Sequence, residues 1–474
     1  RRRRRADSFC VPSDTEDAQP MNVVVTGATG FVGTPLVRAL LAAGHAVTAL
    51  SRDVARAARR LPARCHVVAW NPAGALDPAT LRGADALVHL AGEGIAEARW
   101  TAARKSAIRD SRVNTSAAMV RALGQLDASD RPRVLVSASA IGWYGDRGDT
   151  PLDEHSSSGT GFLADVCRDW ERAVFDAQAL GVRTVALRIG VVLGRDGGAL
   201  QSLLPLFRLG LGGRVGSGRQ WFSWIHLHDL VGLLRYVLEN QNATGPINGV
   251  APEPVTNATF TAELGRAVHR PALFPVPAAV LRAVFGEMSA VLLASQRVQP
   301  RCAQQLGFVF RFPTLRSAIE ELCADPSHEL FVEQRLARRP EEVFPFFSDP
   351  GNLEKITPAF LRFKLLGTTT PQIGNGTLIS YALRLHSIPL RWQSRIESWT
   401  PNRMFVDVQT RGPYTLWHHT HEFEPDDGGT LIRDRVRYRL PFGALGDVIA
   451  GWLVRRDLDA IFDFRRRRIE ELMA

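Results

Sequence analysis

The sequence is poor in the residues that build disulfide scaffolds and structural metal sites. Its 474 residues include five cysteines, which are widely separated and form no Cys-x-x-Cys pair. An odd number of scattered cysteines argues against a disulfide framework and a structural zinc cluster, and it is typical of reduced thiols in the cytosol. The composition therefore predicts a cytoplasmic protein.

Long apolar runs and a concentrated basic patch are also missing. No apolar stretch reaches the roughly 18 residues that a membrane-spanning helix needs, so no transmembrane segment is expected. The formal net charge is +10, but residues 327–474 hold 21 basic and 19 acidic residues, and the excess is spread along the chain. A phosphate backbone requires a clustered patch, so the pattern argues against nucleic acid as a partner. Residues 1–20 have no apolar core after their five arginines and are predicted to be a disordered tail rather than a secretory signal.

A glycine-rich turn near the start of the chain carries the strongest functional signal. Residues 21–33 read MNVVVTGATGFVG, in which a β-branched run leads directly into the turn, and a helical pattern follows. Gly27 suits a tight turn, Gly30 allows the backbone to approach a pyrophosphate, and Gly33 allows the helix to pack closely on the strand. A strand, a glycine turn and a helix in this order predict a dinucleotide site at the helix N-terminus, the alternative being a purely structural turn.

The end of the second predicted strand indicates which dinucleotide binds. Enzymes that hold NAD usually place an acidic residue there to bond the ribose 2′-hydroxyl. This sequence has Ser51 and Arg52 instead, which can bind a 2′-phosphate that an acid would repel. We therefore expect NADP as the cofactor, while a solvated loop charge at Arg52 is the structural alternative.

Strand and helix patterns alternate through the first half of the chain, which predicts a doubly wound α/β fold with a parallel sheet. From about residue 200 the regularity loosens into a smaller lobe that closes with a helix before residue 325. We expect a first domain over residues 21–325, whose C-terminal lobe covers about 200–325. The strand order implied by the pattern places ligands at the carboxyl ends of the strands.

Several segments resemble the extended short-chain dehydrogenase/reductase superfamily, and in particular its atypical epimerase family of unassigned substrate. The segments are TGATGFVG at 26–33, DALVHLAG at 85–92, SASAIGWYG at 137–145, FLADVCRDWE at 162–171, LGLGGRVGSGRQWFSWIHLHDL at 209–230, and a Trp-x4-Lys-x5-Ser-Arg stretch that starts at Trp100. The resemblance implies a Rossmann fold with a small substrate lobe. It also implies that Phe31, Leu90, Ala91 and Gly92 line the cofactor together with the glycines and Arg52.

The superfamily's acid–base chemistry requires a Ser and a Tyr-x3-Lys pair, and this chain departs from that pattern. Ser139 matches the serine position, but Phe162 and Val166 stand where the Tyr and the Lys are expected. Neither side chain can transfer a proton. Tyr144 lies in the WYG turn, from which it could reach the site, so Ser139 and Tyr144 are the candidate catalytic residues.

Two interpretations therefore remain open for the first domain. It is either an oxidoreductase or epimerase-like enzyme with relocated acid–base residues, for which Glu93 and Lys105 are further candidates, or an NADP(H)-binding sensor or scaffold without turnover. As solvated charges, Glu93 and Lys105 would have no catalytic role. The substrate, the oligomeric state and any contact between domains do not follow from the sequence.

Residues 329–474 have a different pattern of predicted strands and helices from the first domain. They resemble the START-like helix-grip superfamily, in its polyketide cyclase and coenzyme Q-binding branch. A long helix is expected from about Phe442 to Met473. The resemblance rests on an opening strand, on the stretches PEEVF at 340–344, FSD at 347–349 and NL at 352–353, and on residues 453–472 of this closing helix. It implies an α+β domain whose sheet wraps around the helix and holds an apolar small molecule. Trp392, Trp399, Phe405 and Trp417 could line such a cavity or simply pack in the core.

Three histidines in this second domain raise the question of a metal. Alternation along a strand places His419 and His421 on one face and His418 on the other. No carboxylate or cysteine accompanies them at a recognisable spacing, so the sequence predicts no metal site.

Overall fold

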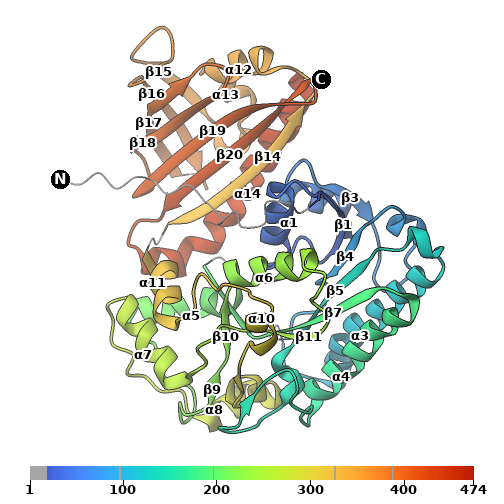
Figure 1. Ribbon diagram of the computed structural model, residues 1–474. Coiled ribbons are helices and arrows are strands. Elements are labelled where there is room, and N and C mark those ends of the chain that lie inside the picture. Colours follow the sequence, from blue (N-terminus) through green and yellow to red (C-terminus); the bar gives the residue numbers. More distant parts are fainter. Residues whose placement is uncertain (1–18, 96–97, 196, 325–326, 387, 474) are drawn as a thin grey trace.

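The computed structural model describes residues 19–95, 98–195, 197–324, 327–386 and 388–473. The predicted disordered tail, apart from residues 19 and 20, lies outside these ranges. Figure 1 shows two bodies, an α/β domain built from the first two thirds of the chain and a domain with a curved antiparallel sheet built from the last third. This arrangement confirms the Rossmann and helix-grip fold classes.

A seven-stranded parallel sheet forms the centre of the first domain. Its strands, in spatial order, are β11 (Gly245–Gly249), β7 (Arg183–Ile189), β5 (Val134–Ala140), β4 (Ala86–His89), β1 (Asn22–Thr26), β2 (Ala46–Ser51) and β3 (His66–Ala69). Each strand pairs in parallel with its neighbours, and the order reverses direction at β1 and β4. That reversal is the point at which ligands bind in doubly wound sheets.

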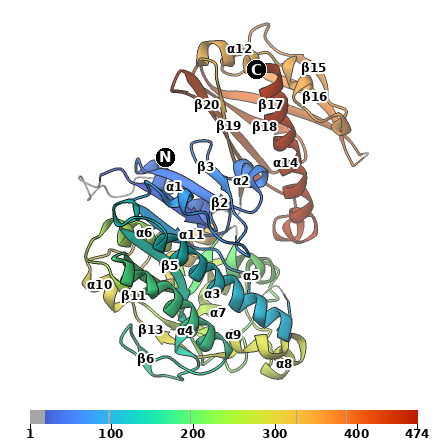
Figure 2. The ribbon, with the colours of Figure 1, turned by 90° about the vertical axis from the view of Figure 1, so that its right-hand side faces the viewer.

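Helices cover both faces of the sheet, as Figure 2 shows from the side. They are α1 (Gly33–Ala42), α2 (Val54–Arg60), α3 (Ala102–Gly124), α4 (Phe162–Phe175) and α6 (Leu227–Glu239). Val23 and Val25 of β1 pack in one core with α1 and α6, whereas Val24 packs in the opposite core with α3 and α4. Because successive side chains of a strand point to opposite faces, the three-valine run serves both layers.

The remainder of the first domain forms a smaller lobe with a core of its own, which includes Leu200, Trp224 and Ile319. Its helices are α5 (Gly198–Arg208), α7 (Asn257–Ala267), α8 (Ala278–Phe285), α9 (Ala290–Leu293), α10 (Arg301–Gln305) and α11 (Leu315–Ala324). Among the described residues, three short two-stranded sheets also belong to this region. They pair β8 (Val191–Gly194) with β10 (Trp224–His226), β9 (Trp221–Phe222) with β12 (Val255–Thr256), and β6 (Pro151–Leu152) with β13 (Arg297–Val298).

The second domain is an antiparallel seven-stranded sheet wrapped around a long helix. The spatial order is β14 (His328–Leu336), β20 (Gly429–Arg439), β19 (Leu416–Asp426), β18 (Met404–Arg411), β17 (Ile388–Thr400), β16 (Leu378–Leu385) and β15 (Lys364–Thr368). The helices are α12 (Pro340–Ser348), α13 (Asn352–Lys355) and α14 (Ala444–Met473). Leu458 and Phe462 of α14 pack against Val436 and Tyr438 of β20, so the helix closes the concave face of the sheet.

The two domains touch along α1, α2 and α5 of the first and along β14, β19 and α14 of the second. Arg59 pairs with Asp463 at 3.2 Å, Arg64 with Asp426 at 3.0 Å, and Arg208 with Asp447 at 3.4 Å. The guanidinium of Arg38 also lies 4.4 Å from the ring centre of Phe331. The basic partners come mainly from the Rossmann domain and the acidic ones from the helix-grip domain, so the contact is complementary in charge.

Candidate functional site

The glycine turn joins the carboxyl end of β1 to the start of α1, beside the end of β4. Gly27 has φ +70°, and a Cβ there would lie 2.6 Å from the carbonyl carbon of Leu90. A Cβ on Gly33 would lie 2.1 Å from the Gly27 carbonyl oxygen, whereas one on Gly30 would meet that oxygen at 3.1 Å. Gly27 and Gly33 are therefore required by the turn itself, because backbone atoms occupy the space that a side chain would need.

The N-terminus of α1 is suited to an anionic group. Val32 precedes the helix with no side-chain cap, and the first turn holds no acidic residue. The helix dipole and the unpaired N–H groups of such a terminus attract phosphate. The ring of Phe31 fills the space beside Gly194, at the end of β8, and beside Gly197 and Gly198, at the start of α5. Phe31 therefore connects the turn to the second lobe.

Ser51 and Arg52 lie at the end of β2, next to the turn in the sheet order. The Ser51 hydroxyl donates to the carbonyl of Asp53 at 3.1 Å, and the Asp53 carboxylate caps α2 by accepting from the N–H of Arg56 at 2.8 Å. The carboxylate is therefore engaged by α2. Arg52 is exposed and makes no hydrogen bond or ion pair with any residue that the structure describes. Its guanidinium is available to an anion.

The loop after β4, which contains Leu90, Ala91 and Gly92, is held in place by the stretch from Trp100 to Arg112, most of which lies on α3. The Ser111 hydroxyl accepts from the N–H of Glu93 at 3.1 Å, and the Arg112 guanidinium donates to the Glu93 carbonyl at 2.9 Å. The same stretch supplies Trp100, whose indole N–H donates to Ile95 at 2.9 Å. The spacing of Trp100, Ser111 and Arg112 therefore has a structural role, because these side chains hold the loop after β4 at the carboxyl edge of the sheet.

Ser139 sits near the carboxyl end of β5, but its hydroxyl is already engaged. It donates to Glu171 at 2.7 Å, and Glu171 forms a buried ion pair with Arg188 at 2.8 Å. The side chains of this pair are 4% and 3% exposed. Ser139 therefore belongs to a closed polar network rather than to an open site.

Tyr144 is fully buried and belongs to the same network. Its hydroxyl donates to the Asn248 side chain at 2.7 Å and accepts from Arg188 at 3.1 Å. Burial raises the pKa of Tyr144 to about 12, although Arg188 acts in the opposite direction. A phenol with this pKa holds its proton near neutral pH. The catalytic roles of Ser139 and Tyr144 remain predictions, and in this conformation neither hydroxyl is free.

Phe162 lies where the superfamily pattern expects a tyrosine, and two side chains from the α3 region converge on it. Trp100 packs edge-on against its ring with centroids 5.1 Å apart, and the Lys105 ammonium lies 5.5 Å from the ring centre. Lys105 also pairs with Glu287 of the smaller lobe and is 30% exposed. Glu93 instead pairs with Arg104 at 3.2 Å. Lys105 is thus a titratable group that lies over the Phe162 ring, and its ion pair with Glu287 connects it to the smaller lobe.

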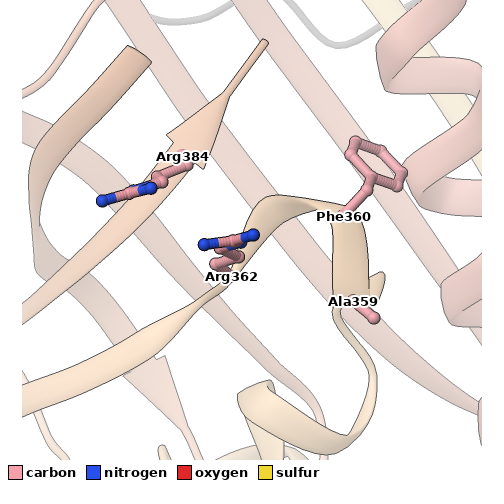
Figure 3. Close-up of a pocket in the computed structure, with 4 residues that line it drawn as sticks. All are labelled: Ala359, Phe360, Arg362 and Arg384. Atoms are coloured by element: carbon pink, nitrogen blue, oxygen red, sulfur yellow. The ribbon is translucent and has the colours of Figure 1, made fainter. Parts of the chain in front are cut away.

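The aromatic side chains that could have lined a cavity in the second domain pack against one another. Trp392 contacts Trp417 edge-on at 5.0 Å, and Trp399 lies 5.4 Å from Phe405. A hollow of about 390 Å³ lies at the edge of this domain, lined by Ala359, Phe360, Arg362 and Arg384. Figure 3 shows that the Phe360 ring points away from the two arginines, so the hollow is polar rather than apolar.

A group of histidine and aspartate side chains in the interior of the second domain has no recognisable signal in the local sequence. Asp407 of β18 and Asp434 of β20 lie beside His419 and His421 of β19, and Asp407, His419 and His421 are arranged closely enough to hold a metal ion. The carboxylates are absent from the local sequence because neighbouring strands supply them. Only the strand register could have revealed this group.

Among the described residues, every helix is too short or too polar to cross a lipid bilayer.

The fold and the turn define the first domain as a Rossmann protein of the dinucleotide-binding class. Comparison with known proteins then identifies the family. Residues 23–249 match the NAD dependent epimerase/dehydratase family, residues 276–322 match a domain of unknown function, and residues 327–470 match the polyketide cyclase / dehydrase and lipid transport family.

Individual relatives align with the first domain and its lobe. An epimerase family protein of Mycobacterium bovis is 42% identical over 299 residues, which are 63% of this chain and 96% of the relative. The crystal structure of the human epimerase family protein SDR39U1 with NADPH is 37% identical and covers 64% of this chain and 100% of that chain, with a TM-score of 0.58. A nucleoside-diphosphate sugar epimerase structure from Corynebacterium glutamicum is 36% identical, with a TM-score of 0.52 over 65% of this chain and 59% of that chain. The chain belongs to the epimerase family, to which it adds a polyketide cyclase and lipid transport domain.

Proposed function

We propose that the first domain, residues 21–325, is an NADP(H)-dependent oxidoreductase or epimerase-like enzyme that acts on a small molecule. The observation that carries the proposal is the end of β2, where Arg52 is exposed and unpaired among the described residues and Asp53 is engaged as a helix cap. The NADPH in the human relative's structure supports the same cofactor. The N-terminus of α1, which has no side-chain cap and no acidic residue in its first turn, fits a pyrophosphate.

We assign the other roles in binding and catalysis to residues of this chain. Arg52 binds the 2′-phosphate, and the loop at Leu90–Gly92, held by Ser111 and Arg112, borders the cofactor. NADPH bound there would supply a hydride. Lys105, whose ammonium lies over the Phe162 ring, would donate the accompanying proton to a substrate oxygen in place of the missing tyrosine.

Cofactor preference tests the proposal. We expect the wild-type protein to bind NADPH at least tenfold more tightly than NADH in a fluorescence titration, and Arg52→Ala to abolish most of this preference, because a guanidinium–phosphate contact is charge-assisted. Arg121→Ala, which removes an exposed arginine from the far end of α3, is the matched control and should leave the preference unchanged. Equal binding of both cofactors by the wild type, or none at about 1 mM, overturns the proposal.

A second candidate function is NADP(H) binding without turnover, as a sensor or scaffold. It is favoured by the closed hydrogen bonds of Ser139 and Tyr144 and by Phe162 and Val166 at the usual Tyr and Lys positions. NADPH oxidation with a panel of carbonyl substrates separates the two. Turnover that falls at least 100-fold in Lys105→Met but survives in Tyr144→Phe supports the enzyme with a relocated proton donor. Loss in Ser139→Ala or Tyr144→Phe instead would assign catalysis to those residues.

For the second domain, residues 329–474, we propose binding of an apolar small molecule that is a substrate or product of the first. The match to the polyketide cyclase and lipid transport family supports this role, as does the contact between the domains. If a substrate of the first domain displaces a fluorescent fatty acid from the second domain, the two domains share a ligand, as proposed. If the two domains bind unrelated classes of ligand, the proposal is wrong.

A further inference from the structure

Four polar side chains meet in the interior of the helix-grip domain. They come from three adjacent antiparallel strands, in which Asp407 stands opposite His419 and His421 stands opposite Asp434. The exposed fraction of the side chain is 15% for Asp407, 5% for His419, 7% for His421 and 10% for Asp434. Aromatic rings surround them: Phe405 stacks on His421 at 4.1 Å, and Phe462 of α14 lies 5.6 Å from His419.

Asp407, His419 and His421 each offer one ligand atom, and these atoms lie within 4.8 Å of one another. The carboxylate oxygen Oδ1 of Asp407 lies 3.4 Å from Nδ1 of His419 and 3.5 Å from Nε2 of His421. Ligands bound to zinc at about 2.0–2.2 Å in a tetrahedron lie roughly 3.3–3.6 Å apart. The two distances from Asp407 therefore match two edges of a zinc-centred tetrahedron without any movement of the side chains.

The far sides of these ligands face supporting groups. Asp434 lies against the remaining nitrogens of both rings: its Oδ1 is 3.2 Å from Nε2 of His419 and 2.6 Å from Nδ1 of His421. The second contact has the distance of an ion pair, although its angle is not that of a hydrogen bond. The second oxygen of Asp407 accepts from the Ser394 hydroxyl at 3.1 Å. Metal-binding histidines commonly direct their other nitrogen at a carboxylate in this way, which fixes the ring orientation.

The charge of the group also matches a divalent cation. When both imidazoles are neutral, as metal binding requires, the two carboxylates give the group a net charge of −2. Aromatic rings, including Phe405 and Phe462, lie against it. A buried, uncompensated charge is strongly unfavourable, and one divalent ion makes the group neutral.

We infer that Asp407, His419 and His421 bind a divalent transition-metal ion of the zinc class, with Asp434 and Ser394 positioning the ligands. Two imidazoles and one carboxylate are the donor set of open, three-ligand sites, which leave a coordination position for an oxygen-bearing small molecule. The helix-grip domain would thus bind a ligand with a carbonyl, enol or carboxylate oxygen. This inference does not depend on the cofactor of the first domain.

Titration of the chelator-treated, full-length protein with Zn²⁺, followed by calorimetry, tests the site, and Co²⁺ provides an absorbance signature of its coordination. We expect one equivalent of Zn²⁺ to bind and visible Co²⁺ bands to appear. Asp407→Asn and His421→Asn should weaken Zn²⁺ binding at least 100-fold, and Asp434→Asn should weaken it 10–100-fold.

The matched control is His418→Ala, which removes a neighbouring histidine that faces away from the group and lies 3.6 Å from Glu397. It should bind Zn²⁺ as the wild type does. Circular dichroism checks the fold of each variant, and the wild-type titration decides the inference even if a variant unfolds. No stoichiometric binding at 100-fold excess Zn²⁺, or binding that persists in Asp407→Asn and His421→Asn, would overturn the proposal.

Discussion

At the scale of single residues, the buried network around Arg188 explains why the expected catalytic hydroxyls are not free. Glu171 accepts from both Ser139 and Arg188, and Tyr144 donates to Asn248. Removal of one partner of a buried ion pair lowers stability by more than the intact pair contributes, because the other charge is left buried and unpaired. The network therefore fixes the junction of β5, β7 and α4 below the site.

Glu171→Ala should lower the free energy of unfolding by about 3–5 kcal/mol, because it leaves the Arg188 guanidinium buried without a carboxylate. Urea unfolding measures the change. Asp169→Ala is the control: it removes a partner of Arg109 that is partly exposed, and a loss below about 1 kcal/mol is expected. Equal effects of the two substitutions would contradict the structural role assigned to Glu171.

His89 predicts a pH dependence of stability. Burial lowers the pKa of His89 to about 3, with a further contribution from Arg112. In the unfolded chain the pKa is about 6.5, so below pH 6.5 the unfolded state takes up a proton that the folded state does not. The stabilisation is complete above pH 6.5 and is lost progressively as the pH falls towards 3.

His89→Asn removes this titration and keeps a polar atom near the Thr26 hydroxyl, which lies 2.7 Å from Nδ1 of His89. Between pH 7 and pH 5 the wild type should lose about 2 kcal/mol more unfolding free energy than the variant, as measured by urea titration at both pH values. Parallel losses in the two proteins would show that His89 is not the responsible group.

At the scale of elements, the sequence predicted the strands and helices that have strong apolar patterns and missed those that lack them. The glycine turn and the long helix α14 lie where they were expected. Strand β11 has no such pattern, because its residues, GPING, include two glycines and a proline. The apolar stretch at 279–295 forms two short helices, α8 and α9, because Gly286 adopts φ +58° and interrupts it.

The turn between β1 and α1 provides an element-scale prediction. Gly33→Ala should destabilise the protein by about 1–3 kcal/mol and weaken NADPH binding, because its Cβ would meet the Gly27 carbonyl oxygen and push α1 away from the strand. Gly74→Ala, in an exposed loop where a Cβ has ordinary contact distances, is the control. Thermal unfolding with and without NADPH measures both effects, and a neutral Gly33→Ala would contradict the packing described for the turn.

At the scale of the whole molecule, the sequence predicted two domains but could not predict how they meet. The interdomain pairs join residues that are more than 200 positions apart, as in Arg208 with Asp447 and Arg64 with Asp426. The histidine–aspartate group of the second domain shows the same limit, because Asp407 and Asp434 reach His419 and His421 only through the strand register. Local patterns determine elements, whereas sites assembled from several elements require the fold.

Hydrogen exchange of the full-length protein with and without NADPH reports both whether the cofactor binds and where. We expect slower exchange of backbone amides in residues 27–34, at Ser51 and Arg52, and in residues 90–93, with little change in residues 327–473. Protection confined to the helix-grip domain, or no protection at NADPH concentrations near 1 mM, would contradict a cofactor site at the glycine turn.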